Sequence, residues 1–186
     1  MRIAIAGMSG FVGGALQKVF LAHGYSVFGI LRNELSSDTL QKKLDGCDVV
    51  INLAGAPIIA RWSDAYKRIL RDSRITTTQK LANTINAMQT PPSLFISTSA
   101  IGIYKNDAIY DESTSGYADD FLANLCQEWE AVANSVNAPR VAIARFGVVI
   151  GKNGGALSQM LPIFKLGLGG IIGSGKQQFS WIHIDD

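Results

Sequence analysis

Short apolar runs alternate along this chain with segments in which apolar residues recur at helical spacing. The apolar runs, which are typical of buried strands, are 2–7, 26–32, 48–55, 93–100 and 140–151. The segments with helical spacing between them are 12–22, 36–44, 63–88 and 119–136. Because strands that alternate with helices form βαβ units, the pattern predicts an α/β fold with a doubly wound parallel sheet.

The first strand leads directly into three regularly spaced glycines. The stretch "GMSGFVG" places Gly7, Gly10 and Gly13 between this strand and the first helix. In a dinucleotide-binding loop the first glycine makes the tight turn, the second lets the backbone approach a pyrophosphate, and the third lets the helix pack on the sheet. The helix N-terminus then faces the anion. The loop and its position predict an NAD(P)-binding Rossmann fold, whereas the glycines alone would fit a structural turn.

The end of the second strand bears on which dinucleotide is bound. An acidic residue there would hold the ribose hydroxyls of NAD, whereas an Arg can meet the 2′-phosphate of NADP. The strand ends in Leu31 and Arg32, which favours NADP. Glu34 lies close by and keeps NAD possible, and a solvated charge at a strand end is the alternative interpretation of Arg32.

Composition narrows the function classes. The chain has 186 residues, of which 47% are hydrophobic and 17% charged, and its net charge is +2. A near-neutral chain gives no electrostatic reason to expect nucleic acid or a membrane surface as partner, and no apolar run reaches the length that spans a bilayer. Cys47 and Cys126 have neither metal-ligand nor disulfide spacing, so we expect no metal site and a cytoplasmic location. The oligomeric state is left open.

Longer motifs carry a family resemblance. The stretches "INLAG", "RWSDAYKRILRDSR", "DDFLANLCQEWE" and "RFGVVIGKNGGALSQMLPIFKLGLGG" resemble the atypical extended short-chain dehydrogenase/reductases called epimerase family proteins, which are similar to nucleoside-diphosphate-sugar epimerases. The resemblance implies a Rossmann fold that binds NADP(H). It assigns cofactor contacts to Gly7, Ser9, Gly10, Phe11, Val12 and Gly13 at the pyrophosphate, Leu31 and Arg32 at the adenosine ribose, Leu53, Ala54 and Gly55 at the next strand end, and Arg74. For Arg74, a surface charge on a helix is the alternative.

Two features depart from the family pattern. Only about fifteen residues separate the second strand from "DVVINLAG", where the family has room for a further short strand and an acidic residue near the adenine. The chain also stops at Asp186, where the family continues into a substrate-binding portion. We therefore expect a dinucleotide-binding domain over 1–150 and only the start of a substrate-binding portion, truncated, over 151–186.

The catalytic pair of the family is missing. Ordinary members carry a Tyr and, four residues later, a Lys on the helix that matches 119–136, and the Lys lowers the pKa of a phenol that would otherwise titrate near ~10. Leu122 and Cys126 occupy the two positions here. Together with Leu125 and Trp129 they form an apolar stripe, which predicts that both are buried structural residues.

Other residues could take part in catalysis. Ser99 ends a strand beside the expected nicotinamide site and matches the hydroxyl that orients the substrate, and Tyr104 lies on the loop just beyond. A packed ring on a solvated loop is the alternative for Tyr104. The function that follows is an oxidoreductase or epimerase acting on a small hydroxyl or carbonyl compound, such as a nucleotide sugar, and the glycine-rich segment 167–175 favours such a substrate. The rival is a non-catalytic, cofactor-binding regulatory or interaction protein.

Overall fold

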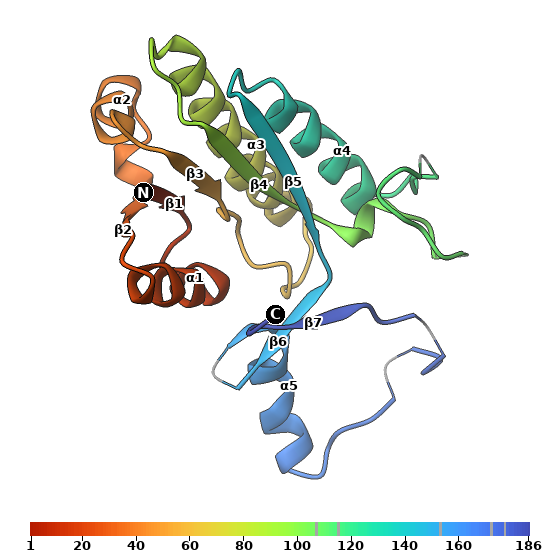
Figure 1. The fold of residues 1–186 in the computed structure, drawn as a ribbon. Coiled ribbons are helices and arrows are strands. Elements are labelled where there is room, and N and C mark those ends of the chain that lie inside the picture. Colours follow the sequence, from red (N-terminus) through yellow and green to blue (C-terminus); the bar gives the residue numbers. More distant parts are fainter. Residues whose placement is uncertain (107, 115, 153, 172, 177) are drawn as a thin grey trace.

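A computed structural model describes residues 1–106, 108–114, 116–152, 154–171, 173–176 and 178–186. Its central sheet is parallel and has the strand order β2-β1-β3-β4-β5 (Figure 1). The strands are β1 (Arg2–Ala6), β2 (Ser26–Ile30), β3 (Val49–Asn52), β4 (Leu94–Ala100) and β5 (Arg140–Phe146). The strand order reverses between β1 and β3, so the carboxyl ends of these strands form the crevice in which open α/β sheets bind ligands. The predicted doubly wound fold is confirmed.

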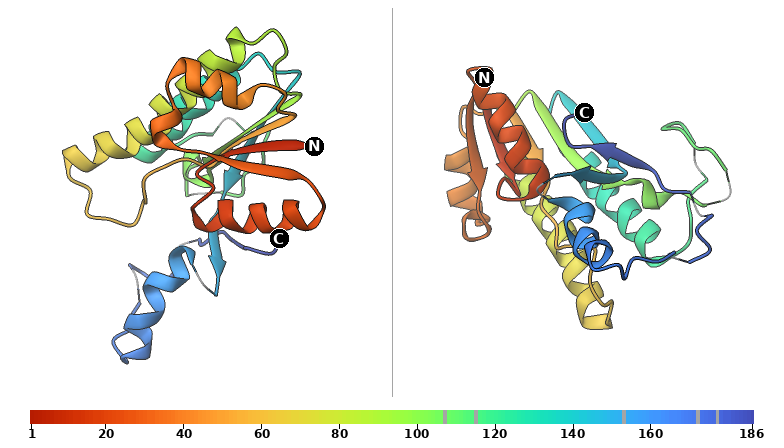
Figure 2. Two further views of the ribbon diagram at one scale, coloured as in Figure 1. Left: turned by 90° about the vertical axis from the view of Figure 1, so that its left-hand side faces the viewer. Right: turned by 90° about the horizontal axis from the view of Figure 1, so that it is seen from below.

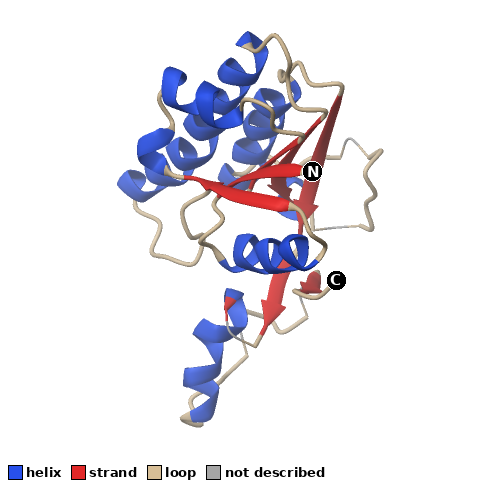
Figure 3. Cartoon of the chain, turned by 60° about the vertical axis from the view of Figure 1, so that its left-hand side comes forward, coloured by secondary structure: helices blue, strands red, loops and turns tan. Residues whose placement is uncertain are grey.

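Helices cover both faces of the sheet. Helix α1 (Phe11–Ala22) lies on one face, and α2 (Ser37–Leu44), α3 (Asp64–Ala87) and α4 (Phe121–Asn134) lie on the other (Figure 3). Successive strand residues point to opposite faces of the sheet. Ile3, Ile5 and Ile51 pack toward α1, whereas Ala4 and Val50 pack toward α2 and α3. This two-sided burial explains why the strands are continuous apolar runs in the sequence.

A buried hydrogen-bond network ties the second layer to the sheet. The Asn52 amide donates to Thr78 Oγ1 at 2.8 Å and to Ser97 Oγ at 3.3 Å, and Trp129 Nε1 donates to Thr78 Oγ1 at 2.8 Å. These side chains come from β3, α3, β4 and α4, and Asn52, Thr78 and Ser97 are fully buried. Because a buried polar group without a partner is costly, the network fixes how α3 and α4 sit on the carboxyl half of the sheet.

Two predicted strands end earlier in the structure than the apolar runs suggested. The run 26–32 stops at Ile30, because Arg32–Glu34 form a 3-10 turn, and the run 48–55 stops at Asn52. In both cases the apolar run continues into the loop at the carboxyl edge, where the candidate site lies.

The predicted single strand 140–151 is wrong, because the chain changes sheet at Gly147. Strand β6 (Val148–Gly151) leaves the central sheet and pairs in parallel with β7 (Trp181–His183), and α5 (Gly155–Lys165) follows β6 (Figure 2). A Cβ atom at residue 147 would lie 2.8 Å from the carbonyl oxygen of Ser180, so only glycine lets the two segments approach so closely. The change of sheet falls just before residue 150, and the division into 1–150 and 151–186 stays a prediction.

The described part of the chain contains no helix that is both long and apolar enough to cross a bilayer. The segment 167–175, which the sequence assigns to a substrate cleft, includes residue 172, which lies outside the described residues. Its cleft role therefore also stays a prediction.

Candidate functional site

The glycine loop after β1 is shaped by two very close backbone approaches. Gly7 has φ +84°, and a Cβ atom there would lie 2.8 Å from Leu53 O, at the end of β3. A Cβ at Gly13 would lie 2.4 Å from Gly7 O. These two glycines are therefore required by the fold itself. Gly10 differs, because its Cβ would meet only Gly7 O, at 3.2 Å. Space is kept beside Gly10, where the expected pyrophosphate would approach.

Helix α1 begins at this loop without a capping side chain from the described residues. Gly10 is the N-cap residue, and its carbonyl accepts from Gly14 N at 2.8 Å. The amides of Phe11, Val12 and Gly13 form the first turn, in which N–H groups have no partner within the helix. Ser9 is exposed beside them. An uncapped helix start with a glycine cradle fits an anion such as a pyrophosphate.

The ring of Phe11 packs against the second sheet and not toward the glycine loop. It packs against the turn between β6 and α5, where a Cβ at Gly154 would lie 2.3 Å from the ring and a Cβ at Gly151 2.7 Å. The expected contact of Phe11 with the cofactor is therefore left to its backbone, since its side chain binds the second sheet. This contact could not be predicted from local patterns, because the two segments are far apart along the chain.

At the end of β2 the carboxylate of Glu34 is already bound. Its Oε2 accepts from the Leu31 amide at 2.7 Å and from Lys43 Nζ at 2.5 Å. The hydrogen bonds from Lys43 and from the Leu31 backbone hold the pKa of Glu34 below its usual range. Arg32 is exposed and forms no ion pair within the described residues. Glu34, which kept NAD possible, is thus an ionised carboxylate whose charge is compensated by Lys43. Arg32 has no such partner among the described residues and can bind a phosphate.

The end of β3 forms the next wall of the crevice. Leu53 N donates to Ala6 O at 2.9 Å, and Ala54 N donates to Asn52 Oδ1 at 3.3 Å, so this turn is pinned beside the glycine loop. Gly55 follows and is exposed. The structure therefore brings the predicted residues of the first and third strands together at one edge of the sheet.

Arg74 lies directly beneath this turn. It is only 8% exposed, so the alternative of a surface charge is wrong. Its guanidinium donates to Leu70 O at 3.1 Å and to Ala56 O at 3.0 Å, and its Cζ lies 5.4 Å from the centre of the Trp129 ring. Burial lowers the pKa of Arg74. A Cβ at Gly55 would lie 3.0 Å from this guanidinium, so the cation underlies the loop, and its contact with a cofactor stays a prediction.

The predicted Ser99 hydroxyl lies between β4 and α4. It is close to the thiol of Cys126 and the carboxylate of Glu130, and both neighbours face it from α4. Its Oγ is buried and within reach of both groups, and it lowers the pKa of the Glu130 carboxyl, although neither contact has the geometry of a full hydrogen bond within the described residues. The structure therefore places Ser99 at the interface of β4 and α4, and its role toward a substrate stays a prediction.

Tyr104 is held by an ion pair that sequence reasoning missed. Arg145 on β5 forms two bonds to Glu130 on α4, at 2.8 and 2.7 Å, and donates to the Tyr104 oxygen at 2.5 Å and to the Tyr117 oxygen at 3.1 Å. The Tyr104 hydroxyl donates in turn to Asp111 O at 2.9 Å. The signal was available, because an acidic residue at 130 on a buried helical face requires a cation nearby.

The two positions of the missing catalytic pair are apolar in their surroundings. Cys126 is buried, and burial raises the pKa of its thiol, as expected for a structural cysteine. Leu122 is only half-buried, so the prediction that it is a buried residue is wrong. It lies in the first turn of α4 and faces Gly102, which leaves one side of the leucine open.

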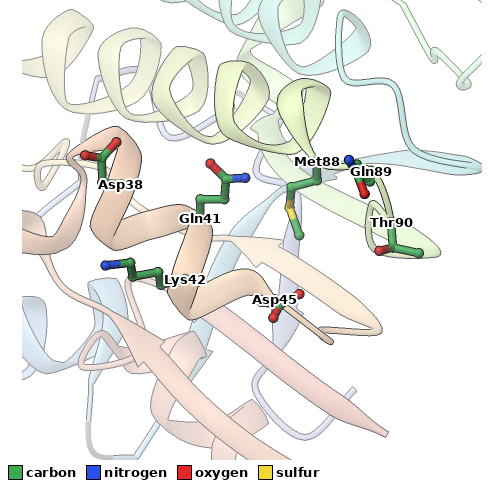
Figure 4. Close-up of a pocket in the computed structure, with 7 residues that line it drawn as sticks. All are labelled: Asp38, Gln41, Lys42, Asp45, Met88, Gln89 and Thr90. Carbon is green, nitrogen blue, oxygen red and sulfur yellow. The ribbon is translucent and has the colours of Figure 1, made fainter.

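A separate groove of about 520 Å³ lies between α2 and the end of α3. Figure 4 shows Asp38, Gln41 and Lys42 on its α2 side, and the Gln41 side chain points toward Met88. The groove extends to Asp45 and Thr90, which precede β3 and β4, so it reaches the amino ends of the strands, away from the glycine loop. No residue assigned to the cofactor lines it.

Fold, glycine loop and crevice together define a nucleotide-binding α/β protein of the Rossmann type. Residues 3–186 match the NAD dependent epimerase/dehydratase family. The chain belongs to this family.

Similar proteins include the epimerase family protein SDR39U1 homolog of Arabidopsis thaliana, described as chloroplastic, which is 35% identical over the whole of this chain and 60% of its own length. The crystal structure of the human epimerase family protein SDR39U1 with NADPH superposes with a TM-score of 0.89 at 38% identity, covering 100% of this chain and 67% of that one. A nucleoside-diphosphate sugar epimerase from Corynebacterium glutamicum superposes with a TM-score of 0.84 at 34% identity, covering 100% of this chain and 41% of that one.

Proposed function

We propose that this chain binds NADP(H) and supports oxidoreductase or epimerase chemistry on a small hydroxyl or carbonyl compound, such as a nucleotide sugar. The observation that carries the proposal is the glycine cradle at the uncapped start of α1, with Gly10 open toward the crevice. The NADPH of the similar human protein and the family match support it. The chain spans about three fifths of the Arabidopsis thaliana relative and two thirds of the human one. The activity assigned to it here is therefore a proposal.

Each wall of the crevice has a role in holding the cofactor. The amides of the first turn of α1 would bind the pyrophosphate, Arg32 the 2′-phosphate, and the turn Leu53–Gly55 would line the dinucleotide beyond it. Arg74 would stabilise this turn from below through its bond to Ala56 O. NAD is disfavoured, because the only acidic side chain at the end of β2 among the described residues is Glu34, and Lys43 neutralises it.

When bound, NADPH supplies a hydride. The chain itself must then orient the substrate oxygen and provide a proton. Ser99 is the candidate for orienting that oxygen, because it matches the orienting hydroxyl of the family at the end of β4. Tyr104 is the candidate proton source, but its hydrogen atom is directed to Asp111 O, so this bond would have to open during a reaction. Arg145 and Glu130 would hold the phenol in place as positioning residues.

One observation favours a second function. Leu122 and Cys126 stand where the family carries its Tyr and Lys, and the thiol is buried in apolar surroundings. A protein of this kind could bind NADP(H) without turning it over and act as a regulatory or interaction protein. The deciding experiment follows NADPH absorbance with panels of carbonyl compounds, for the wild type and for Tyr104→Phe. Turnover that is lost in the variant supports catalysis by Tyr104, and absence of turnover in a chain that binds NADPH supports the second function.

Arg32→Ala is expected to weaken NADPH binding about ten- to a hundredfold and to leave NADH binding almost unchanged. The reason is that a charge-assisted hydrogen bond to the 2′-phosphate contributes roughly 1.5–3 kcal/mol. Titration calorimetry with both dinucleotides measures the effect. Arg140→Ala is the matched control, because Arg140 is exposed at the amino end of β5. Equal weakening of both dinucleotides would remove the assignment of Arg32.

The cellular location is part of the proposal. Cys47 and Cys126 are both free and buried, which suits a reducing compartment such as the cytoplasm. The Arabidopsis thaliana relative is chloroplastic, so a plastid location is the alternative for a protein of this family.

A further inference from the structure

Glu34 lies close to the end of β2, where an acidic residue favours NAD. It is the last residue of the 3-10 turn Arg32–Glu34 after β2, and its carboxylate accepts from the Leu31 amide, the first backbone group beyond the strand. An acidic residue at this place binds the ribose hydroxyls in NAD-dependent proteins and repels the 2′-phosphate of NADP. The carboxylate of Glu34 therefore opposes the attraction that the neighbouring Arg32 exerts on the 2′-phosphate.

Lys43 compensates the charge of Glu34 and so removes its repulsion of the 2′-phosphate. Its Nζ lies 2.5 Å from Glu34 Oε2, and both side chains are 23% exposed, so the pair is partly shielded from water. Lys43 belongs to the last turn of α2, where a cation also interacts favourably with the helix dipole. Its ammonium lies 6.0 Å from the centre of the Phe28 ring on β2, so it is held against the strand from which Glu34 follows.

We infer that Lys43 is a specificity-determining residue, which selects NADP(H) over NAD(H) by neutralising and occupying the carboxylate of Glu34. The inference rests on the proposed function. Arg32 supplies the attraction for the 2′-phosphate, and Lys43 suppresses the repulsion. The preference for NADP(H) is thus set by three side chains from two elements rather than by the arginine alone.

The test replaces the lysine by a neutral side chain of similar length. In Lys43→Met, Glu34 keeps its backbone bond and regains an uncompensated charge. The ratio of the NADPH and NADH dissociation constants is expected to shift about tenfold toward NADH, because a unit charge now faces the 2′-phosphate. The shift should shrink at high salt, since the interaction of exposed charges is screened. A loss of packing alone would not depend on salt in this way.

Two further variants complete the test. Glu34→Gln in the Lys43→Met background should restore the wild-type ratio, and Glu34→Gln alone should move the ratio toward NADPH, because Lys43 then acts on the phosphate. An unchanged ratio in this single variant overturns the inference even if Lys43→Met does not fold. Lys42→Met is the matched control, since Lys42 is exposed on the side of α2 that lines the groove of Figure 4.

The outcomes separate this inference from the proposed function. If the wild type binds NADPH but the ratio is unchanged in Lys43→Met and in Glu34→Gln, the role of Lys43 is overturned and the proposed function stands. An equal shift in Lys42→Met would also overturn it, because the effect would then come from net charge. A wild type that binds neither dinucleotide would overturn both.

Discussion

Gly10→Val is expected to abolish NADPH binding while the fold is kept, with affinity falling by at least about a hundredfold. The residue has φ −77°, which any amino acid adopts, and its Cβ would meet only Gly7 O at 3.2 Å. The backbone therefore needs to give by only a few tenths of an ångström. The two methyl groups of valine, however, would occupy the space through which the pyrophosphate approaches the first turn of α1. Calorimetric titration with NADPH, together with a thermal denaturation curve, measures both effects.

Gly14→Ala is the matched control for this experiment. It adds a methyl group to the same helix, where the nearest atom would be Met8 O at an ordinary 3.9 Å. Binding should be kept, and stability should rise by about 0.5–1 kcal/mol because alanine is favoured over glycine inside a helix. Near-wild-type affinity in Gly10→Val would mean that the dinucleotide does not sit on this loop.

Glu130→Gln is expected to lower the free energy of unfolding by about 3 kcal/mol. Glu130 is 8% exposed and bridges α4 to β5 through both nitrogens that Arg145 presents to it. Removing one partner of a buried ion pair leaves the other charge without compensation, which typically costs 3–5 kcal/mol. We take the low end because the pair is only partly buried and Arg145 keeps its bonds to two tyrosines. Urea denaturation followed by circular dichroism measures the loss.

The pH dependence of this loss is a second readout. Burial raises the pKa of Glu130, but the hydrogen bonds and the charge of Arg145 outweigh it, so the folded-state pKa lies below the usual value. A lowered pKa means that the pair stabilises the fold above the unfolded-state pKa of about 4.3, and that this stability is lost as pH falls through the folded-state pKa. The difference between the wild type and Glu130→Gln should therefore shrink below about pH 4.

Glu128→Gln provides the comparison on the same helix. Glu128 pairs with Arg71 at the surface, where both side chains are well exposed, and such pairs contribute less than about 1 kcal/mol. If the two variants lose equal stability, Glu130 and Arg145 do not form a buried pair of the kind described above.

Much of the fold was predictable because it depends on local patterns. The strands β1, β3 and β4 are buried on both faces and therefore read as unbroken apolar runs. The break at Gly147 was not predictable, because its cause is the carbonyl of Ser180, which the fold brings there from far along the chain. The half-exposure of Leu122 has a similar origin. Helical periodicity places it on the apolar stripe, but the first turn of α4 is covered on one side only.

The candidate site divides in the same way. The glycine loop could be identified because strand, loop and helix are consecutive in the sequence. The neutralisation of Glu34 could not, since Lys43 approaches it from another helix, and the burial of Arg74 depends on α4 packing against α3. Glu130 could have been noticed as a charge on a buried helical face, but its partner Arg145 lies within an apolar strand and carries no motif.

The contact of Phe11 with Gly151 and Gly154 has a consequence for how this sequence can drift over evolutionary time. A side chain at residue 154 would collide with the ring, so a substitution there becomes tolerable only after residue 11 has become smaller. A smaller residue at 11, however, would leave a void beside the turn between β6 and α5. Each position therefore restricts the mutations that its partner can accept. Lineages can change this pair only in a fixed order, with residue 11 first. A chimera joined between α1 and β6 that combined Phe11 with a larger residue 154 from a homologue would therefore be destabilised.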